Sequence, residues 1–204
     1  WSAPSLANRQ VYSRTYPCPQ LPGKYTLVVQ SGTNTAGQPL GYGFGALTLD
    51  PLGNVKFSGM LGDGTKVSQH TFVSKYGEWP FYASAYGGKE VMTGWVVFTN
   101  DAVSDLAGSV DWLKLPQKSK IYPEGFGFTN PLGVVGCAYR YTNGVPPLDL
   151  SPGGVVQLDG GNLSALVSYA LSPRGANKLA GTNKVTLTIS TGTGLFRGSV
   201  PNPD

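Results

Sequence analysis

A β-hairpin phrase that occurs twice in this chain restricts the folds available to it. The first copy spans residues 48–61 (TLDPLGNVKFSGML) and the second spans residues 188–200 (TISTGTGLFRGSV). In both copies, a strand of alternating residues is followed by a Gly-containing turn and then by Phe-x-Gly and a small or apolar pair. The two turns differ in length by one residue. Residues 106–113 carry a degenerate third copy. A recurring hairpin predicts a β architecture, but it indicates no chemistry.

Composition supports an all-β fold. Only 13% of the 204 residues are charged, whereas the chain has 29 Gly and 16 Pro, a balance that many short strands joined by turns would produce. No segment of helical length shows a sustained i, i+3, i+4 apolar pattern. We therefore expect an antiparallel β-barrel or sandwich built from repeated hairpins.

Strand patterns and prolines together predict four regions. The expected strands are residues 25–29, 42–49, 55–61, 66–74, 79–86, 93–99, 106–113, 155–158, 163–171, 184–189 and 195–200. The expected regions are an N-terminal arm (1–22), a first β unit (23–113), a Pro- and aromatic-rich connector (114–152) and a second, partial β unit (153–204). We expect the first unit to be barrel-like. Within the arm, residues 9–16 look like a strand.

Charge and hydropathy exclude two classes of partner. The net charge is +4, and its fifteen cations are scattered rather than gathered as in a nucleic-acid-binding patch. No apolar stretch reaches about 18 residues, so we expect no membrane span. Low charge with abundant Thr, Ser, Asn and Tyr is typical of secreted β proteins, which predicts a secreted or cell-surface location.

The two cysteines, Cys18 and Cys137, offer one possible disulfide. They are too few for a zinc site and form no C-x-x-C motif. In an oxidising compartment a bridge would tie the arm to the middle of the chain, whereas two free thiols are the alternative.

Several short motifs together resemble a known type of module. They are Gly23-Lys24-Tyr25-Thr26-Leu27, residues 41–45 (GYGFG), residues 61–66 (LGDGTK), Trp79-Pro80-Phe81-Tyr82, Tyr86-Gly87-Gly88, Gly94-Trp95 and Gly194-Leu195-Phe196-x-Gly198. The chain is similar, over roughly residues 23–204, to an uncharacterised β-rich module of very large secreted or surface proteins of Verrucomicrobia-type bacteria, often beside immunoglobulin-like repeats. The resemblance implies no catalytic residues. It also implies further strands after the last hairpin, which do not follow here.

Catalysis has weak support in the sequence. The single histidine, His70, lies in an expected strand, and no G-x-S-x-G motif is present, which argues against a triad hydrolase. Glycoside hydrolysis needs two paired carboxylates. Five of the eleven acids, Asp50, Asp63, Asp101, Asp105 and Asp159, occupy expected turns, whereas Glu78, Glu90, Glu124 and Asp111 lie beside aromatics or in strands. A glycosidase therefore stays an alternative, and we expect no enzyme.

Metal binding has equally little support. Asn100-Asp101 and Asp105 could offer oxygens to Ca²⁺, but their spacing is not that of an EF-hand, and an Asx-rich turn explains them. We expect no metal and no cofactor.

A cluster of aromatics is the one constellation that suggests a ligand. Trp79, Phe81, Tyr82 and Tyr86 lie within eight residues, and Trp95 and Trp112 follow on later strands. Aromatic rings can stack on sugars. Strand alternation places Trp79 and Phe81 on one face and Tyr82 on the other. The candidate ligand-binding residues are therefore Trp79, Tyr82, Tyr86 and Trp112, with core packing as the competing explanation.

The functional expectation is a non-catalytic, extracellular structural or adhesive β module of a larger surface protein. A carbohydrate-binding module is the alternative, with polysaccharide or other protein modules as partners. The return strand of the second hairpin (195–200) is followed by Pro201 and Pro203, which resist continued pairing. Since an exposed edge is a liability, we expect that strand to be covered, either by residues 9–16 or by strand exchange with another chain.

Overall fold

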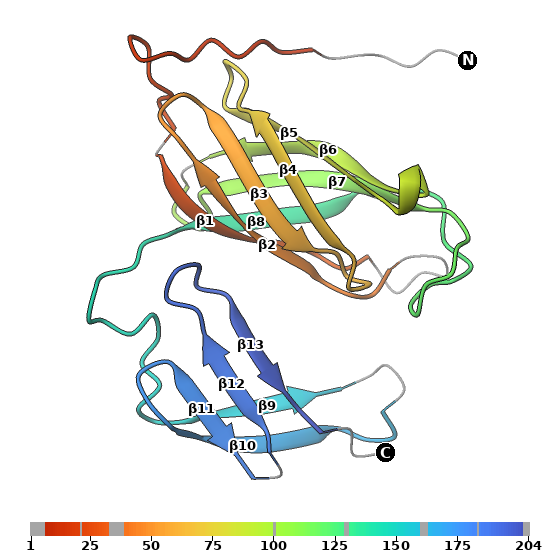
Figure 1. The fold of residues 1–204 in the computed structure, drawn as a ribbon, viewed down its shortest axis with the longest axis vertical. Helices are drawn as coiled ribbons and strands as arrows, with labels where there is room; N and C mark the ends of the chain where they lie inside the picture. The colour runs from red at the N-terminus through yellow and green to blue at the C-terminus, as the bar shows by residue number, and fades with distance from the viewer. Residues whose placement is uncertain are drawn as a thin grey trace. The chain divides into compact units, whose positions relative to one another are not determined.

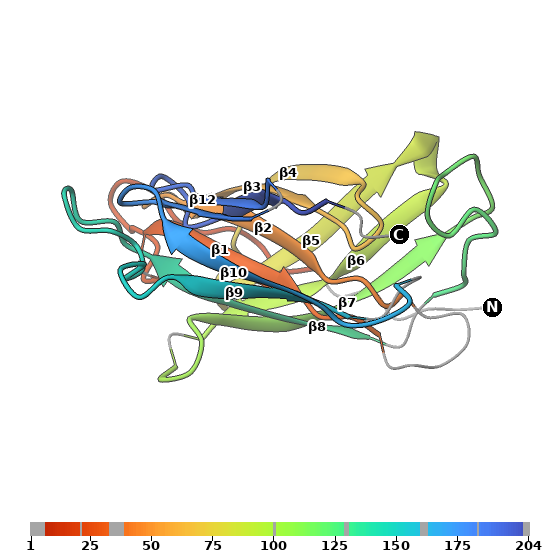
Figure 2. The same cartoon turned by 90° about the horizontal axis from the view of Figure 1, so that it is seen from below.

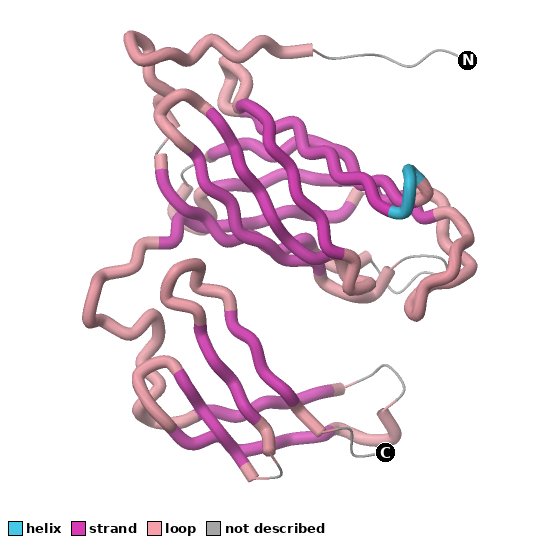
Figure 3. Tube along the Cα trace, in the orientation of Figure 1, coloured by secondary structure: helices cyan, strands magenta, loops and turns pink. Residues whose placement is uncertain are grey.

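Strands account for nearly all the regular structure of this protein, which confirms the predicted all-β class. The computed structural model describes residues 7–20, 22–32, 39–99, 101–128, 131–159, 163–182 and 184–201. Within them the one helical element is a short 3-10 turn, η1 (Tyr86–Gly88) (Figure 3). The chain divides into two compact units, residues 1–139 and 140–204.

The first unit is an eight-stranded antiparallel sheet that curls into a nearly closed barrel (Figures 1 and 2). Its strands are β1 (Gly23–Val29), β2 (Gly43–Leu49), β3 (Asn54–Met60), β4 (Lys66–Phe72), β5 (Glu78–Ala85), β6 (Glu90–Phe98), β7 (Leu106–Lys114) and β8 (Leu132–Tyr139). The order in the sheet is β4-β3-β2-β1-β8-β7-β6-β5. Two meanders of four strands are thus joined where the first strand, β1, pairs with the last, β8.

The barrel is incompletely closed between β4 and β5, which are consecutive in the chain. No backbone ladder joins these two strands, although Ser74 N bonds to Glu78 O at 2.8 Å in the turn between them. The side chain of Gln69 spans the gap instead. Its Nε2 donates to Pro80 O at 2.8 Å, and its Oε1 accepts from Trp79 Nε1 at 2.9 Å. A side-chain amide therefore replaces part of the missing ladder.

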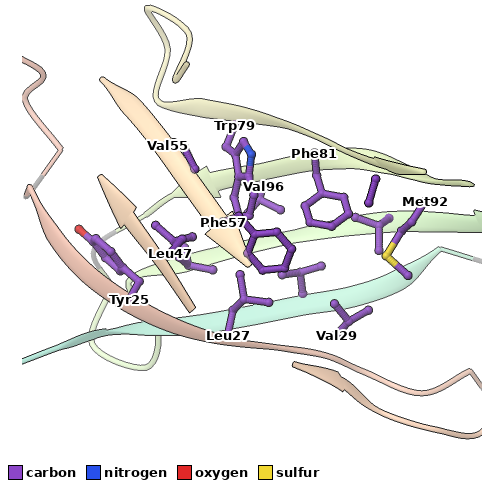
Figure 4. Packing of buried hydrophobic residues seen from close by; sticks show 14 of the residues in the cluster. Tyr25, Leu27, Val29, Leu47, Val55, Phe57, Trp79, Phe81, Met92 and Val96 are labelled. Carbon is purple, nitrogen blue, oxygen red and sulfur yellow. The ribbon is translucent and has the colours of Figure 1, made fainter. Parts of the chain in front are cut away.

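The interior of the barrel is a packed core, as strand alternation requires. Alternate residues of each strand point inward, and Figure 4 shows side chains from several strands meeting. Phe57 lies at its centre, with its ring centroid 5.4 Å from that of Trp79 and 5.3 Å from that of Phe81. A Cβ at Gly59 would come within 2.6 Å of Phe57 Cζ. The Phe-x-Gly phrase thus lets the ring lie against its own strand.

Residues 7–20, the continuous described part of the N-terminal arm, pack on turns of the first unit and form no strand. Lys75 N bonds to Arg9 O at 3.0 Å, Gln10 Nε2 to Leu52 O at 3.0 Å, and Tyr12 OH to Ser74 O at 2.9 Å. These bonds hold the arm against the β2–β3 and β4–β5 turns. The predicted strand over residues 9–16 is therefore wrong, while cover of residues 195–200 by a strand of another chain stays a prediction.

The expected connector also needs correction, because it contains β8. This strand pairs with β1 on one side and β7 on the other, so the first unit extends to Tyr139. Gly133 and Gly136 weaken its strand signal in the sequence. At Gly136 a Cβ would meet Thr26 O, Leu106 and Leu27, so the absent side chain is what lets three strands pack closely.

The second unit is a five-stranded antiparallel meander with the form of a half-barrel. Its strands are β9 (Gly154–Leu158), β10 (Val167–Pro173), β11 (Lys178–Gly181), β12 (Thr186–Ile189) and β13 (Phe196–Ser199), in the order β13-β12-β11-β10-β9. Its buried cluster consists of Leu171, Leu179 and Val185, with partly buried side chains around them. Both predicted hairpins form, as β2–β3 and β12–β13.

Candidate functional site

The outer side of β13 is an open sheet edge in the described part of the chain. Its register with β12 runs from Ile189↔Phe196 to Thr186↔Ser199, and all four of its residues are exposed. The matching strand of the first hairpin, β3, pairs with β2 on one side and β4 on the other. β13 therefore leaves the backbone donors and acceptors of its outer side unpaired, whereas β4 pairs with the equivalent side of β3.

An uncovered aromatic ring lies on the same strand. Phe196 is directly opposite Ile189, so both side chains are on the same face of the sheet, and Ile189 is buried. Phe196 is nevertheless 68% exposed, whereas Phe57, of the equivalent Phe-x-Gly phrase, is 5% exposed. In the first unit, β5 supplies Trp79 and Phe81 to cover Phe57. Among the described residues of the second unit, no strand has this role.

The opposite edge of the second unit is also partly uncovered. β9 pairs only with β10 in the sheet, and its register of Val156↔Tyr169 and Leu158↔Val167 places these four side chains on one face. This face is the inner one, since Leu171 lies on it as well and is buried. Leu158 is exposed, and the other three are half-buried. Both edges and the apolar inner face between them are thus available to further β structure.

A second constellation is a buried charge cluster at one end of the barrel. Lys114 Nζ forms an ion pair with Asp63 and lies 3.8 Å from Glu90 Oε2, with all three side chains at most 1% exposed. Trp112 Nε1 donates to Glu90 Oε1 at 3.1 Å, and Gln117 Nε2 donates to Glu90 Oε2 at 3.3 Å. Two carboxylates thus share one ammonium group inside the protein.

The electrostatics of this cluster favour the protonated form of Glu90. Burial raises the pKa of its carboxyl, and the neighbouring charge of Asp63 raises it further, while Lys114 and the Trp112 and Gln117 hydrogen bonds act in the opposite direction. Paired acids can serve glycoside hydrolysis, but a saccharide cannot reach side chains this deeply buried. The arrangement is chemically suited to holding the barrel end together.

Only part of this cluster is predictable from the sequence. The predicted turn position of Asp63 is confirmed, since its Oδ1 accepts a hydrogen bond from Thr65 N at 2.8 Å. Lys114 was missed. The available signal was its position in β7, two residues after Trp112 and four after Val110, which places a lysine in the inward-facing phase.

The predicted ligand-binding aromatics separate into two groups. Trp79 is 0% exposed and Trp112 is 1% exposed, so their prediction as ligand contacts is wrong. Both occupy inward-facing positions and belong to the core. Tyr82 and Tyr86 are exposed, and the predicted alternation of Trp79 and Phe81 against Tyr82 is confirmed. Tyr86 lies in η1, with Lys114 Nζ 6.0 Å from its ring centroid, and thus belongs to the barrel end.

The two cysteines are free thiols, which corrects the possible disulfide. Cys18 is buried, with its Sγ 2.9 Å from Gln20 Oε1, and burial raises the pKa of the thiol. Cys137 is exposed on the outer side of β8. The two lie in different environments because one belongs to the core and the other to an outward-facing strand position.

The single histidine and the predicted calcium ligands form no site within the described residues. His70 is exposed beside Phe72, with their ring centroids 6.4 Å apart. Asp105 Oδ2 accepts a 2.6 Å bond from Ala138 N, so this carboxylate has a structural role, while Asn100 lies outside the described residues. Across the described ranges, no three His, Cys, Asp or Glu side chains are grouped to hold a metal ion.

Comparison with known proteins gives no relative: no protein-family model, curated protein or solved structure matches this chain. Among the residues that the structure describes, no helix has the length and apolar character needed to cross a membrane.

Proposed function

We propose that this chain is a non-catalytic structural or adhesive β module of a larger secreted or cell-surface protein, and that it assembles with a second copy through β13. The observation that supports this proposal is Phe196, an inward-facing ring at 68% exposure on an open edge strand. A strand added to such an edge gains backbone hydrogen bonds, and side chains reaching the inner face gain apolar contact.

A second copy matches the chemistry of this surface. Each second unit offers two open edges, β9 and β13, with an apolar face between them. Two such half-barrels placed face to face would cover both sets of edges at once, as closed two-fold assemblies do.

Sedimentation velocity across a concentration series tests the assembly, with the full chain and its Phe196→Asp variant. We expect the wild type to form dimers and the variant to remain monomeric, because a carboxylate would be buried in the shared inner face. Phe72→Asp is the matched control, since Phe72 is also exposed but lies on β4 of the first unit.

Two results would contradict the proposal. One is a wild-type chain that stays monomeric at the highest concentration reached. The other is equal dimerisation of the Phe196→Asp variant, with its far-UV circular dichroism unchanged. Ser199→Lys, which adds charge to the edge without altering the inner face, provides a second variant and should also weaken the dimer.

A further inference from the structure

Three neighbouring strands of the barrel present six side chains on one outer surface. The registers Pro80↔Trp95↔Ser109 and Tyr82↔Thr93↔Asp111 run across β5, β6 and β7. Residues directly opposite one another point to the same side of a sheet. The intervening residues, Phe81 on β5 and Val110 on β7, point into the core. We call the outward-facing set the β5–β7 face, and its members are Pro80, Tyr82, Thr93, Trp95, Ser109 and Asp111.

The β5–β7 face has an apolar side and a polar side. Tyr82 is 54% exposed, while Trp95 and Pro80 are half-buried. Tyr82 and Trp95 are diagonal neighbours across β5 and β6, a relation that places backbones about 7–8 Å apart and lets large rings approach each other. Ser109 and Asp111 follow on the next strand. An aromatic surface thus lies beside hydroxyl and carboxylate groups.

The hydrogen-bonding groups of this face are free within the described part of the chain. Trp79 Nε1 bonds to Gln69, and Trp112 Nε1 bonds to Glu90, so both core tryptophans use their indole N–H groups inside the protein. The structure gives no such partner to the Trp95 indole N–H or the Asp111 carboxylate. A donor and a charged acceptor therefore lie beside Tyr82 and remain available to a ligand.

We propose that the β5–β7 face binds a neutral saccharide. The C–H face of a sugar ring can pack on Tyr82 and Trp95, while its hydroxyls donate to Asp111 and exchange hydrogen bonds with Thr93 and Ser109. Asp111 is the one charge among the six residues, so the face repels acidic sugars and has no cation to hold them. This site is on the first unit and is independent of the assembly through β13.

Affinity electrophoresis through gels containing soluble polysaccharides tests this assignment. The probes are two neutral polymers, laminarin and xyloglucan, and an acidic one, polygalacturonate. We expect retardation by at least one neutral polymer and none by the acidic polymer. Tyr82→Ala should weaken the neutral interaction by about tenfold, the loss expected when one aromatic anchor is removed.

Two further variants separate ligand contact from folding. Asp111→Asn preserves shape and should also weaken binding, because it removes the charged acceptor. Tyr76→Ala is the matched control, since Tyr76 is 63% exposed but lies in the β4–β5 turn, and it should bind as the wild type does.

Three outcomes would overturn the assignment. They are retardation by none of the polymers, preference for the acidic polymer, and equal weakening by Tyr76→Ala. If no polymer binds and Tyr82→Ala instead alters sedimentation of the chain, the β5–β7 face contacts protein and the saccharide proposal fails. Loss of assembly in Phe196→Asp with saccharide binding retained would separate the two proposals.

Discussion

At the residue scale, a polar side chain becomes part of the core when its position in the strand alternation points it inward. Glu90 and Lys114 lie directly opposite each other on β6 and β7, both facing inward, and Asp63 reaches the same ammonium from the loop after β3. A buried ion pair contributes little net stability unless its remaining hydrogen bonds are satisfied. Here Trp112 and Gln117 bond to the Glu90 carboxylate.

Glu90→Gln should flatten the pH dependence of stability. The pKa of Glu90 is raised in the folded protein, so the folded state holds a proton that the unfolded chain releases. The contribution of this proton to the free energy of unfolding is fully present below the ordinary carboxyl pKa. It is lost as the pH rises through the raised pKa of the folded protein. Asp63 and Lys114 are the charged groups facing Glu90. Urea unfolding at several pH values from 4 to 8 measures the difference.

The matched control for this prediction is Glu124→Gln, a change at an exposed glutamate. It should keep the wild-type slope of unfolding free energy against pH. Equal slopes for wild type and Glu90→Gln would show that Glu90 titrates alike in both states and would contradict the prediction.

At the scale of single elements, alternation and turn signals identify most strands but not how they close. The strands around Phe57 and Phe81 are where the pattern predicts them. β8 and β11 were missed, because glycines interrupt β8, while β11 (KLAG) contains a single large apolar residue, Leu179, and ends on glycine. The gap between β4 and β5 follows from no local pattern, since Gln69 shares the inward phase of Val67 and this phase does not show which groups of β5 its side chain bonds to.

Gln69→Leu should destabilise the barrel. The change leaves the buried Trp79 indole N–H without an acceptor and removes the donor to Pro80 O, a loss of about 1–3 kcal/mol for an unsatisfied buried group. Urea unfolding gives the free energy of unfolding. Ser68→Ala, at the adjacent exposed position, should change it by less than about 0.5 kcal/mol. A Gln69→Leu variant as stable as wild type would mean that the gap needs no bridge.

At the scale of the whole molecule, the two units differ in how completely their inner faces are covered. The first buries aromatic and aliphatic side chains from all eight strands, whereas the second has a small cluster around Leu171 and Leu179. Partial burial of apolar surface provides less of the driving force for folding. The two units should therefore have different free energies of local unfolding, with the second unit unfolding more easily than the first.

Hydrogen exchange followed by mass spectrometry should show β9–β13 exchanging before β1–β8. The Phe196→Asp variant is suited to this measurement, because assembly would otherwise protect the second unit. The expected result is two separable sets of peptides that divide near Tyr139 and Arg140. Exchange of both units in one concerted step would contradict it.

The sequence alone determined the all-β class, most strand positions and both hairpins, because these depend on local alternation and turn chemistry. It also separated Tyr82 from Trp79 and Phe81 by phase. Only the tertiary structure decided which face was core, and so removed Trp79 and Trp112 from the candidate ligand contacts. It likewise paired β8 with β1, brought Lys114 between two acids and left Phe196 uncovered. Each of these depends on which strands become neighbours, and a periodicity along one strand carries no information about its partner.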